Sequence, residues 1–430
     1  MAQPRFLTRV SASIGFDDNV FQTPTNAQAT PEVVIQQQVT AGTPDQVVFV
    51  PVRDTRPQRI GVISPPPQQQ QFRRVVIPGE APQFEEIVIP GTPKPKRQAS
   101  AVSRETFSFD MQITTRRTLF TVDFNAGADY FWNRPNKKAE YNGSLAIRYL
   151  HRFTPRLQMT ASVDASYLSQ PDPTLINTPI RVGNGNLLTV NAKSDLSYRW
   201  APRFSTVSSV SFNSIMFDDK LRQFGDFRSF TLGTELRYLW SPRLTAVLEG
   251  RYQQISYPNA PAINATSYFA LIGFDLSLTR RVGATVRIGE AIRRFDESGD
   301  AASAPYLEAT LNYQLGRASV LSWSNRFGFE EPPTPTTEVL GFRSGVTVTH
   351  FFGPRLRGSL ALNTIYRSTK DSAVETEFKE LTLDSGLSLL YTLSRYWTFN
   401  MNYSHLTVFT DPVDTGFFRN RLFTGFDYSF

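Results

Sequence analysis

Apolar and polar side chains alternate along residues 157–167, which are Leu157, Gln158, Met159, Thr160, Ala161, Ser162, Val163, Asp164, Ala165, Ser166 and Tyr167. Successive side chains of a β-strand point to opposite faces, so this stretch places its apolar residues on one face and its polar residues on the other. Residues 187–200 and 268–278 show the same alternation. Strands of soluble sheets usually contain about five or six residues. The stretch therefore predicts a long strand that separates an apolar from a polar environment.

A short turn motif separates these stretches at regular intervals. Its clearest copies are Phe153-Thr154-Pro155-Arg156, Trp200-Ala201-Pro202-Arg203, Trp240-Ser241-Pro242-Arg243 and Phe352-Gly353-Pro354-Arg355. Weaker copies are Thr114-Thr115-Arg116, Thr279-Arg280-Arg281, Leu315-Gly316-Arg317 and Leu393-Ser394-Arg395. The eight sites are 37 to 47 residues apart, which leaves room between them for two long strands and one longer loop. Short turns at one end and longer loops at the other are typical of a transmembrane β-barrel.

The turns predict the number of strands. If both termini lie on the short-turn side, eight turns require 18 strands, and sixteen is the alternative if two weak strands are misassigned. The expected strands are 5–17, 105–113, 118–132, 139–153, 157–169, 187–200, 204–218, 226–240, 244–257, 265–278, 282–296, 305–315, 318–330, 338–352, 356–368, 377–392, 396–409 and 418–430. Because hydrocarbon cannot hydrogen-bond to an open edge, we expect this all-β, antiparallel, up-and-down sheet to close into a barrel with short periplasmic turns and longer extracellular loops.

The composition agrees with lipid-facing strands. The chain has 430 residues, of which 40% are hydrophobic, 13% aromatic and 19% charged, and its mean hydropathy is −0.28. No run of 18 apolar residues occurs, which excludes transmembrane helices. The absence of cysteine excludes disulfides and cysteine-based metal sites. The net charge of +7 comes without a dense basic cluster, so we expect no nucleic-acid partner.

The polar face of the strands predicts a water-filled lumen. Every second residue of a strand lies on the same face, and this rule assigns acidic and basic side chains to the polar face in about equal numbers. These numbers predict cross-strand ion pairs and no strong ion selectivity. The candidate lumen-lining residues are Asp123, Asp164, Lys193, Asp195, Arg199, Glu235, Arg237, Glu249, Arg251, Asp275, Arg287, Arg343 and Arg357. An 18-stranded barrel is wide enough for a channel unless a segment plugs it.

A long loop separates the first strand from the others, so we divide the chain into residues 1–19, 20–104 and 105–430. The 20–104 loop holds 13 of the 29 prolines together with glutamine runs. Short β-prone segments recur in it at 33–35, 47–50, 59–63, 75–77 and 87–89. Three interpretations stay open: a disordered loop, a plug that folds into the lumen, and a site for an extracellular partner protein.

The last strand bears on location. Leu422, Thr424, Phe426, Tyr428 and Phe430 share one face of an amphipathic strand that ends the chain. This pattern resembles the C-terminal signal read by the bacterial outer-membrane assembly machinery, so Phe426, Tyr428 and Phe430 are the candidate assembly signal. We expect the bacterial outer membrane as the location, a signal peptide that has been removed, and contact with membrane lipid and lipopolysaccharide.

The sequence offers little catalytic chemistry. His151, His350 and His405 are the only histidines, and no common catalytic motif occurs. Asn402, Ser404 and His405 are the nearest approach to a hydrolase site. We therefore expect no catalytic residue, no metal site, no cofactor and no enzymatic activity.

The first strand carries a sharper motif. It ends in Phe16-Asp17-Asp18-Asn19, followed by Val20, and in this it resembles the opening of the family known as β-barrel porin 2. The resemblance implies an outer-membrane barrel that passes hydrophilic solutes. It also implies export of exopolysaccharide beside a periplasmic polysaccharide export protein, as for some members. The alternative is a structural or assembly barrel whose 20–104 loop plugs the lumen or binds a partner protein.

Overall fold

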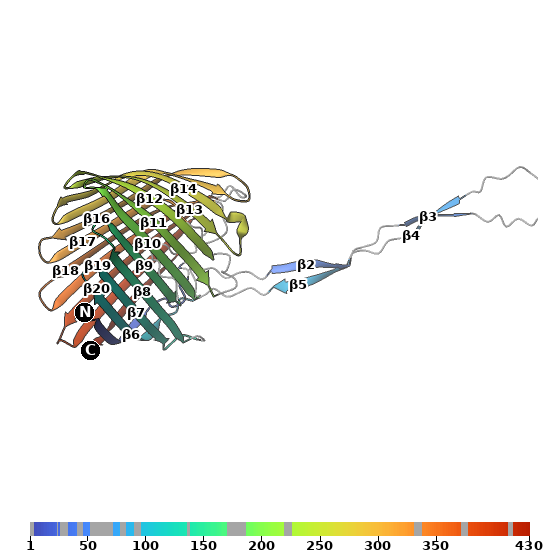
Figure 1. Cartoon of the computed structure of the whole chain (residues 1–430). Coiled ribbons are helices and arrows are strands. Elements are labelled where there is room, and N and C mark those ends of the chain that lie inside the picture. Colours follow the sequence, from blue (N-terminus) through green and yellow to red (C-terminus); the bar gives the residue numbers. More distant parts are fainter. Residues whose placement is uncertain are drawn as a thin grey trace, which may run out of the picture. The chain divides into compact units, whose positions relative to one another are not determined.

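The computed structural model describes residues 4–23, 25, 33–40, 46–51, 72–77, 83–89, 96–135, 138–169, 186–218, 226–330, 338–370, 377–411 and 416–430. Eighteen long strands in these ranges form one closed antiparallel barrel (Figure 1). β1 (Arg5–Asp17) closes it by pairing with both β6 (Ser100–Thr114) and β22 (Phe417–Ser429). The predicted 18-strand barrel is thereby confirmed, and the sixteen-strand alternative is wrong.

The remaining barrel strands follow one another around the wall. They are β7 (Thr118–Phe131), β8 (Ala139–Arg152), β9 (Leu157–Leu168), β10 (Leu187–Ala201), β11 (Phe204–Phe217), β12 (Phe227–Ser241), β13 (Leu244–Ser256), β14 (Ala265–Thr279), β15 (Val282–Phe295), β16 (Ala301–Leu315), β17 (Ser319–Phe329), β18 (Glu338–Phe351), β19 (Leu356–Lys370), β20 (Glu377–Thr392) and β21 (Trp397–Asp411). β6 and β16 begin four or five residues before their predicted starts, because Ser100 pairs with Asp17 and Ala301 pairs with Arg294.

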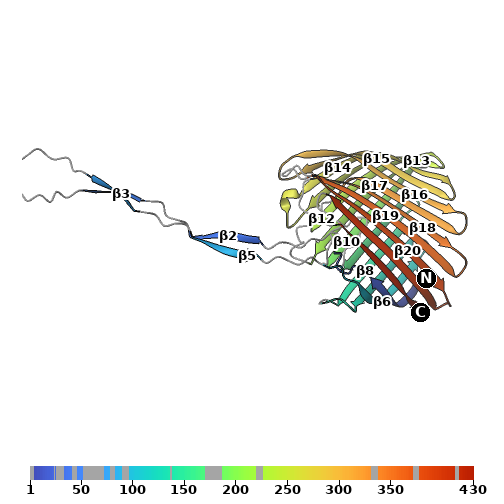
Figure 2. The same ribbon diagram turned by 180° about the vertical axis from the view of Figure 1, so that it is seen from behind.

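Both ends of the chain lie at the same end of the barrel, as Figures 1 and 2 show. Thr8 and Phe430 exchange two backbone hydrogen bonds of 3.1 and 2.9 Å there, so the C-terminal residue belongs to the closed sheet. The short turns lie at this end, and several are closed by a hydroxyl side chain. Thr115, Thr154 and Thr279 each accept two backbone N–H groups of their own turn at 2.9–3.2 Å. Ser394 does the same at 3.2 Å, which explains why Ser or Thr recurs at this place in the motif.

One face of every strand is apolar and exposed. This outward band includes Ile14, Phe107, Phe124, Leu196, Leu232, Leu248, Ile272, Ile288, Leu362, Leu387 and Phe426. Exposed aromatic residues gather beside the short turns, among them Phe153, Trp200, Trp240, Phe352, Trp397 and Phe430. A closed sheet with an apolar outer band and an aromatic girdle satisfies its backbone internally and matches hydrocarbon outside. The protein is an outer-membrane β-barrel.

The chain divides into two compact units, residues 1–27 with 96–430, and residues 28–95. The second unit contains two hairpins. β2 (Val33–Thr40) pairs with β5 (Gln83–Ile89), and β3 (Gln46–Pro51) pairs with β4 (Phe72–Ile77). Four of the five predicted β-prone segments thus form strands, and 59–63 lies outside the described residues. Residues 20–23 and 96–104, which the sequence assigned to the loop, belong to the barrel unit.

The described part of the chain contains one helical segment, a single 3₁₀ turn at Pro261–Ile263. No helix in those ranges has the length and apolar character needed to cross a membrane.

Candidate functional site: the lumen wall

The inner face of β12 to β15 carries a network of ion pairs centred on Arg287. The Arg287 guanidinium lies 2.8 Å from Asp275 on the adjacent strand, 3.4 Å from Glu249 and 3.8 Å from Glu235. Its side chain therefore reaches across three strands. Glu235 and Glu249 are direct cross-strand neighbours, a like-charged pair that would destabilise the sheet on its own. Arg287 and Arg237, which pairs with Glu235 at 2.8 Å, offset that repulsion.

A glycine on the adjacent strand makes room for this central arginine. Gly273 is the cross-strand partner of Arg287. A Cβ atom at Gly273 would lie 2.7 Å from Cδ of Arg287 and 2.1 Å from the Val286 carbonyl oxygen, closer than real Cβ atoms approach. Arg251 likewise has a glycine, Gly233, as its cross-strand partner. Arginine therefore lies across the lumen wall where a neighbouring strand lacks a side chain.

The network continues toward β16 through Arg251. This guanidinium binds Glu308 at 3.0 Å, also pairs with Glu249, and donates to the Tyr306 hydroxyl at 3.1 Å. The side chains of Glu249 and Arg251 are largely withdrawn from water. Charges removed from water need close, hydrogen-bonded partners, and here each acid has an arginine within reach.

A second cluster lies at the loop end of β17 and β18. Glu330 directly follows β17 and is buried, and Arg343 binds it in a bidentate pair with one N–O distance of 2.7 Å. Burial alone would raise the pKa of the Glu330 carboxyl, but the positive charges of Arg343 and Arg326 outweigh it and hold that pKa at about 2. Arg343 Nη1 has no hydrogen-bond partner among the described residues.

These two clusters border a cavity of about 620 Å³ on one side of the lumen. Its wall carries six basic and four acidic side chains. Of the predicted lumen residues, it includes Lys193, Glu235, Arg237, Glu249, Arg251, Asp275, Arg287 and Arg343. The structure thus brings together eight residues that the sequence spreads over 150 positions.

The other predicted lumen residues lie apart from this cavity. Asp123 and Asp164 pair with Arg148 at 2.8 and 3.6 Å, and Asp195 pairs at 3.2 Å with Lys193, which itself borders the cavity. These groups are partly exposed, so each pair contributes little stability. Arg199 and Arg357 are exposed near the short turns, and the described contacts include no ion pair for either.

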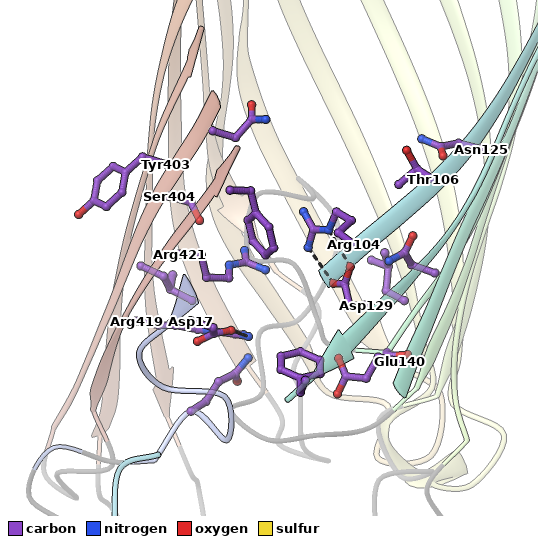
Figure 3. A pocket seen from close by; sticks show the side chains of 18 residues that line it. Asp17, Arg104, Thr106, Asn125, Asp129, Glu140, Tyr403, Ser404, Arg419 and Arg421 are labelled. Atoms are coloured by element: carbon purple, nitrogen blue, oxygen red, sulfur yellow. Dashed lines mark hydrogen bonds and ion pairs between the residues drawn. The ribbon is translucent and has the colours of Figure 1, made fainter. Parts of the chain in front are cut away.

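A second cavity of about 370 Å³ lies against the opposite wall, across the strand pairing that closes the barrel. Figure 3 shows two ion pairs in its lining: Arg104 with Asp129, joined by hydrogen bonds of 2.7 Å, and the buried pair of Asp17 with Arg419. Tyr403 points away from the cavity on the outer side of its strand, whereas its neighbour Ser404 points inward.

The motif 16–19 holds the barrel closure together. Phe16 is exposed on the outer face, whereas Asp17 is buried and binds Arg419 of β22 at 3.0 Å. Asp18 accepts the backbone N–H and side-chain amide of Asn420 at 2.7 and 2.6 Å. Burial would raise the pKa of Asp18, but the hydrogen bonds from Asn420 and the pair with Arg97 lower it below its usual value.

Asn19 completes this arrangement by folding the chain back at the end of β1. Its side chain binds the Thr23 backbone at 2.8 and 3.2 Å and donates to the Phe418 carbonyl at 2.9 Å. Arg97 and the hydrogen bond from Val20 to Gln98 tie the far end of the loop to the same place. The motif therefore holds residues 20–23 and 97–98 of the barrel unit against the end of β1.

The histidines lie on the outer face. His151 and His350 accept or donate hydrogen bonds of 2.8 and 2.7 Å with Thr118 and Ser319, and each contacts a girdle phenylalanine edge-on. His405 binds Asn420 at 2.7 Å. Ser404 precedes His405 in β21 and so faces the lumen, and the two cannot form one hydrolytic site. The described residues contain no group of acidic or histidine side chains arranged to hold a metal ion.

Sequence reasoning missed several lumen residues for identifiable reasons. Glu330 has the inward parity of its strand, but it lies at the strand end and was not singled out. Glu140 of β8 pairs with Arg134, which lies in the loop before that strand, and alternation cannot indicate a contact with a loop residue. Uncharged inward residues such as Asn125 and Asn402 are absent from the predicted lumen residues, all of which are charged.

Comparison with known proteins adds similar folds and no family. No protein-family model and no curated protein matches the chain. It is similar to a BenF-like porin from Pseudomonas fluorescens Pf-5, with 12% identity, a TM-score of 0.45, and coverage of 99% of this chain and 98% of that one. The chain is also similar to OpdK from Pseudomonas aeruginosa, with 10% identity, a TM-score of 0.44, and coverage of 99% of both chains. Its similarity to OccAB4 from Acinetobacter baumannii has 10% identity, a TM-score of 0.41, and coverage of 99% of this chain and 98% of that one. Membership of β-barrel porin 2 stays a prediction.

Proposed function

We propose that the protein is a passive outer-membrane channel for small hydrophilic solutes. The observation that carries this proposal is the inner face, where acidic and basic side chains of β12 to β16 form a polar wall around a cavity of about 620 Å³. Because these charges largely offset one another in pairs, the wall favours water and small polar solutes without strong preference for one sign of ion. The lumen residues and the comparisons offer no support for polysaccharide export.

Conductance in planar lipid bilayers tests this proposal. The full chain is compared with a variant in which residues 28–95 are replaced by a short Gly-Ser linker. Asp18, Arg97 and the Val20–Gln98 hydrogen bond stay in place in that variant, so the barrel closure is retained. We expect stepwise conductance from the deletion variant with weak cation–anion discrimination. A correctly folded deletion variant that conducts nothing would refute the channel.

A second candidate function concerns the 28–95 unit, whose two hairpins pair with no third strand among the residues that the structure describes. Two-stranded hairpins are at most marginally stable alone in water, and an unpaired edge accepts a further strand. The segment Phe72-Arg73-Arg74-Val75-Val76-Ile77-Pro78-Gly79 is repeated at 84–91 as Phe-Glu-Glu-Ile-Val-Ile-Pro-Gly. If segment 72–79 of one copy lies parallel to segment 84–91 of another, each arginine is opposite a glutamate and each apolar residue is opposite an apolar residue. We propose that this unit binds a second copy of the chain through these segments.

Charge reversal tests this self-association by sedimentation of the detergent-solubilised full chain. Arg73→Glu with Arg74→Glu, or Glu85→Arg with Glu86→Arg, gives chains that carry one sign of charge in both segments. Each variant alone should be monomeric, and an equimolar mixture of the two should associate as the wild type does. A wild-type chain that is monomeric at every concentration, or variants that associate unmixed, would refute this interface.

A further inference from the structure

The smaller cavity has a lining unlike the rest of the lumen. Thr106, Asn125 and Asn142, from β6, β7 and β8, lie on one side of it, and Asn402 and Ser404, from β21, lie on the other. Figure 3 shows Thr106 and Asn125 on the wall facing the strand of Ser404. All five side chains are at least partly exposed to the lumen. Three amides and two hydroxyls thus face one space of about 370 Å³.

Five of the six charged residues that line this space are ion-paired with a neighbour. Arg104 binds Asp129 in a bidentate pair, Arg419 binds Asp17, and Arg134 binds Glu140. Arg104 also lies over the Phe423 ring, 4.0 Å from its centre. Arg421, which borders the cavity as well, has contacts of its own. A solute entering here meets ion pairs that would have to be broken before they could bind an opposite charge.

The uncharged side chains, in contrast, are available to hydrogen-bond to a solute. Among the described residues, no side-chain hydrogen bond is formed by Thr106, Asn125, Asn142, Asn402 or Ser404. Each amide offers two N–H donors and an acceptor oxygen, and each hydroxyl offers a donor and acceptor positions. Together they present donors and acceptors in comparable numbers, which is what a solute hydroxyl group requires of its partners.

Gly127 lies between Thr106 and Asn142 on the inner face of the wall. It is the cross-strand partner of both Thr106 and Asn142. A Cβ atom at Gly127 would lie 2.6 Å from the Asn142 Oδ1 atom and 3.0 Å from the Thr106 methyl carbon. The amide and the threonine side chain therefore occupy the space above the glycine and are brought close together there.

We infer that this cavity binds a neutral polyhydroxylated solute, a small sugar or polyol, during its passage through the barrel. The inference rests on the proposed channel and names its substrate class. Neutral hydroxyl groups can both donate to and accept from the amides, and they leave the surrounding ion pairs intact. An anion or a cation would have to compete with the ion pairs described above for its counter-charge.

Two measurements with sucrose as the probe test the site and the channel separately. Calorimetric titration of the detergent-solubilised full chain reports binding whether or not the barrel conducts. Current block by sucrose in planar bilayers, on the variant lacking residues 28–95, reports binding within a conducting channel. In both, Asn125→Leu with Asn402→Leu is compared with the parent chain and with Asn213→Leu. Asn213 belongs to β11, outside both cavities, and serves as the matched control.

We expect the double variant to raise the sucrose concentration for half-maximal binding and block by roughly tenfold or more, since at least two hydrogen bonds are lost. The control should bind as the parent does. Equal sucrose binding by the parent and the double variant, or none by either, would overturn the site while leaving any measured conductance intact. Sucrose binding without conductance would instead refute the channel and retain the site.

Discussion

Removal of the buried carboxylate at position 17 should destabilise the pairing of β1 with β22 that closes the barrel. Asp17 is 1% exposed and its partner Arg419 is 4% exposed. The carboxylate accepts Nε of Arg419 at 3.0 and 3.1 Å, pairs with Nη2, and accepts the Asn19 backbone N–H at 3.0 Å. Asp17→Ala removes these four contacts and takes the Asp17 charge away from the buried Arg419 guanidinium.

Loss of one partner of a buried pair costs about 3–5 kcal/mol, whereas replacement of both by apolar residues of similar volume is often nearly neutral. We therefore expect Asp17→Ala to lower the free energy of unfolding by about 3–5 kcal/mol. Asp17→Leu combined with Arg419→Met should cost less than either single change. The Asp17→Asn variant, which keeps an acceptor for the Asn19 backbone, should fall between the wild type and Asp17→Ala.

The assay is equilibrium unfolding of vesicle-inserted protein by guanidinium, followed by tryptophan emission. The double-mutant cycle of Asp17 and Arg419 isolates the energy of the pair. Arg148→Met breaks a partly exposed pair on the same barrel and serves as the control, with an expected loss of about 1 kcal/mol or less. An Asp17→Ala variant no less stable than this control, or strictly additive single changes, would refute this role of the pair.

Three further predictions follow from individual residues. Gly289→Ala should destabilise the barrel by roughly 1–3 kcal/mol in the same unfolding assay, because its Cβ would lie 1.9 Å from the Ala270 carbonyl oxygen; Gly250→Ala, which meets nothing within 4 Å, should be neutral. The pKa of Glu330 is lowered to about 2, so its contribution to stability is present above the ordinary value of 4.5 and is lost as pH falls from 4.5 toward 2; Glu330→Gln should flatten stability against pH in that window, and an unchanged slope would contradict the assignment. Deletion of Phe430 should reduce outer-membrane assembly in cells, measured by heat-modifiable migration, more than Phe352→Ala does, although the two rings are 62% and 63% exposed; equal effects would argue against a terminal assembly signal.

Local sequence patterns indicate where the strands lie, whereas contacts between distant strands depend on the tertiary structure. Strand number, most strand ends and the inward or outward direction of each side chain follow from alternation and turn spacing, both of which are local. The run at 157–167 becomes β9, and the turn copies become the short turns. Even the inward direction of Glu330 follows from parity, although its burial under Arg343 does not.

Contacts between inward side chains could not be read in this way. Arg287 reaches Glu235 across three strands, 52 positions earlier, because the tilt of the strands around the barrel sets which residues share a level. Glycines at 273 and 233 leave the space for these long side chains. The motif 16–19 reads as a strand end followed by a loop, and its role depends on Arg419 and Asn420, which lie some 400 positions away.

The sequence by itself determined a closed 18-stranded barrel, apolar outside and polar inside, because period-two alternation directs each side chain independently of its distant neighbours. Only the tertiary structure decided how the interior is divided. It placed one cavity lined mainly by charged side chains on one wall. Across the closure of β1 and β22 it placed a smaller cavity, in which uncharged amides and hydroxyls lie among ion-paired side chains. The physical reason is the closure of the barrel. Pairing of the first strand with the last brings residues 106, 125 and 402 to one surface, and a local sequence pattern cannot indicate that they are close in space.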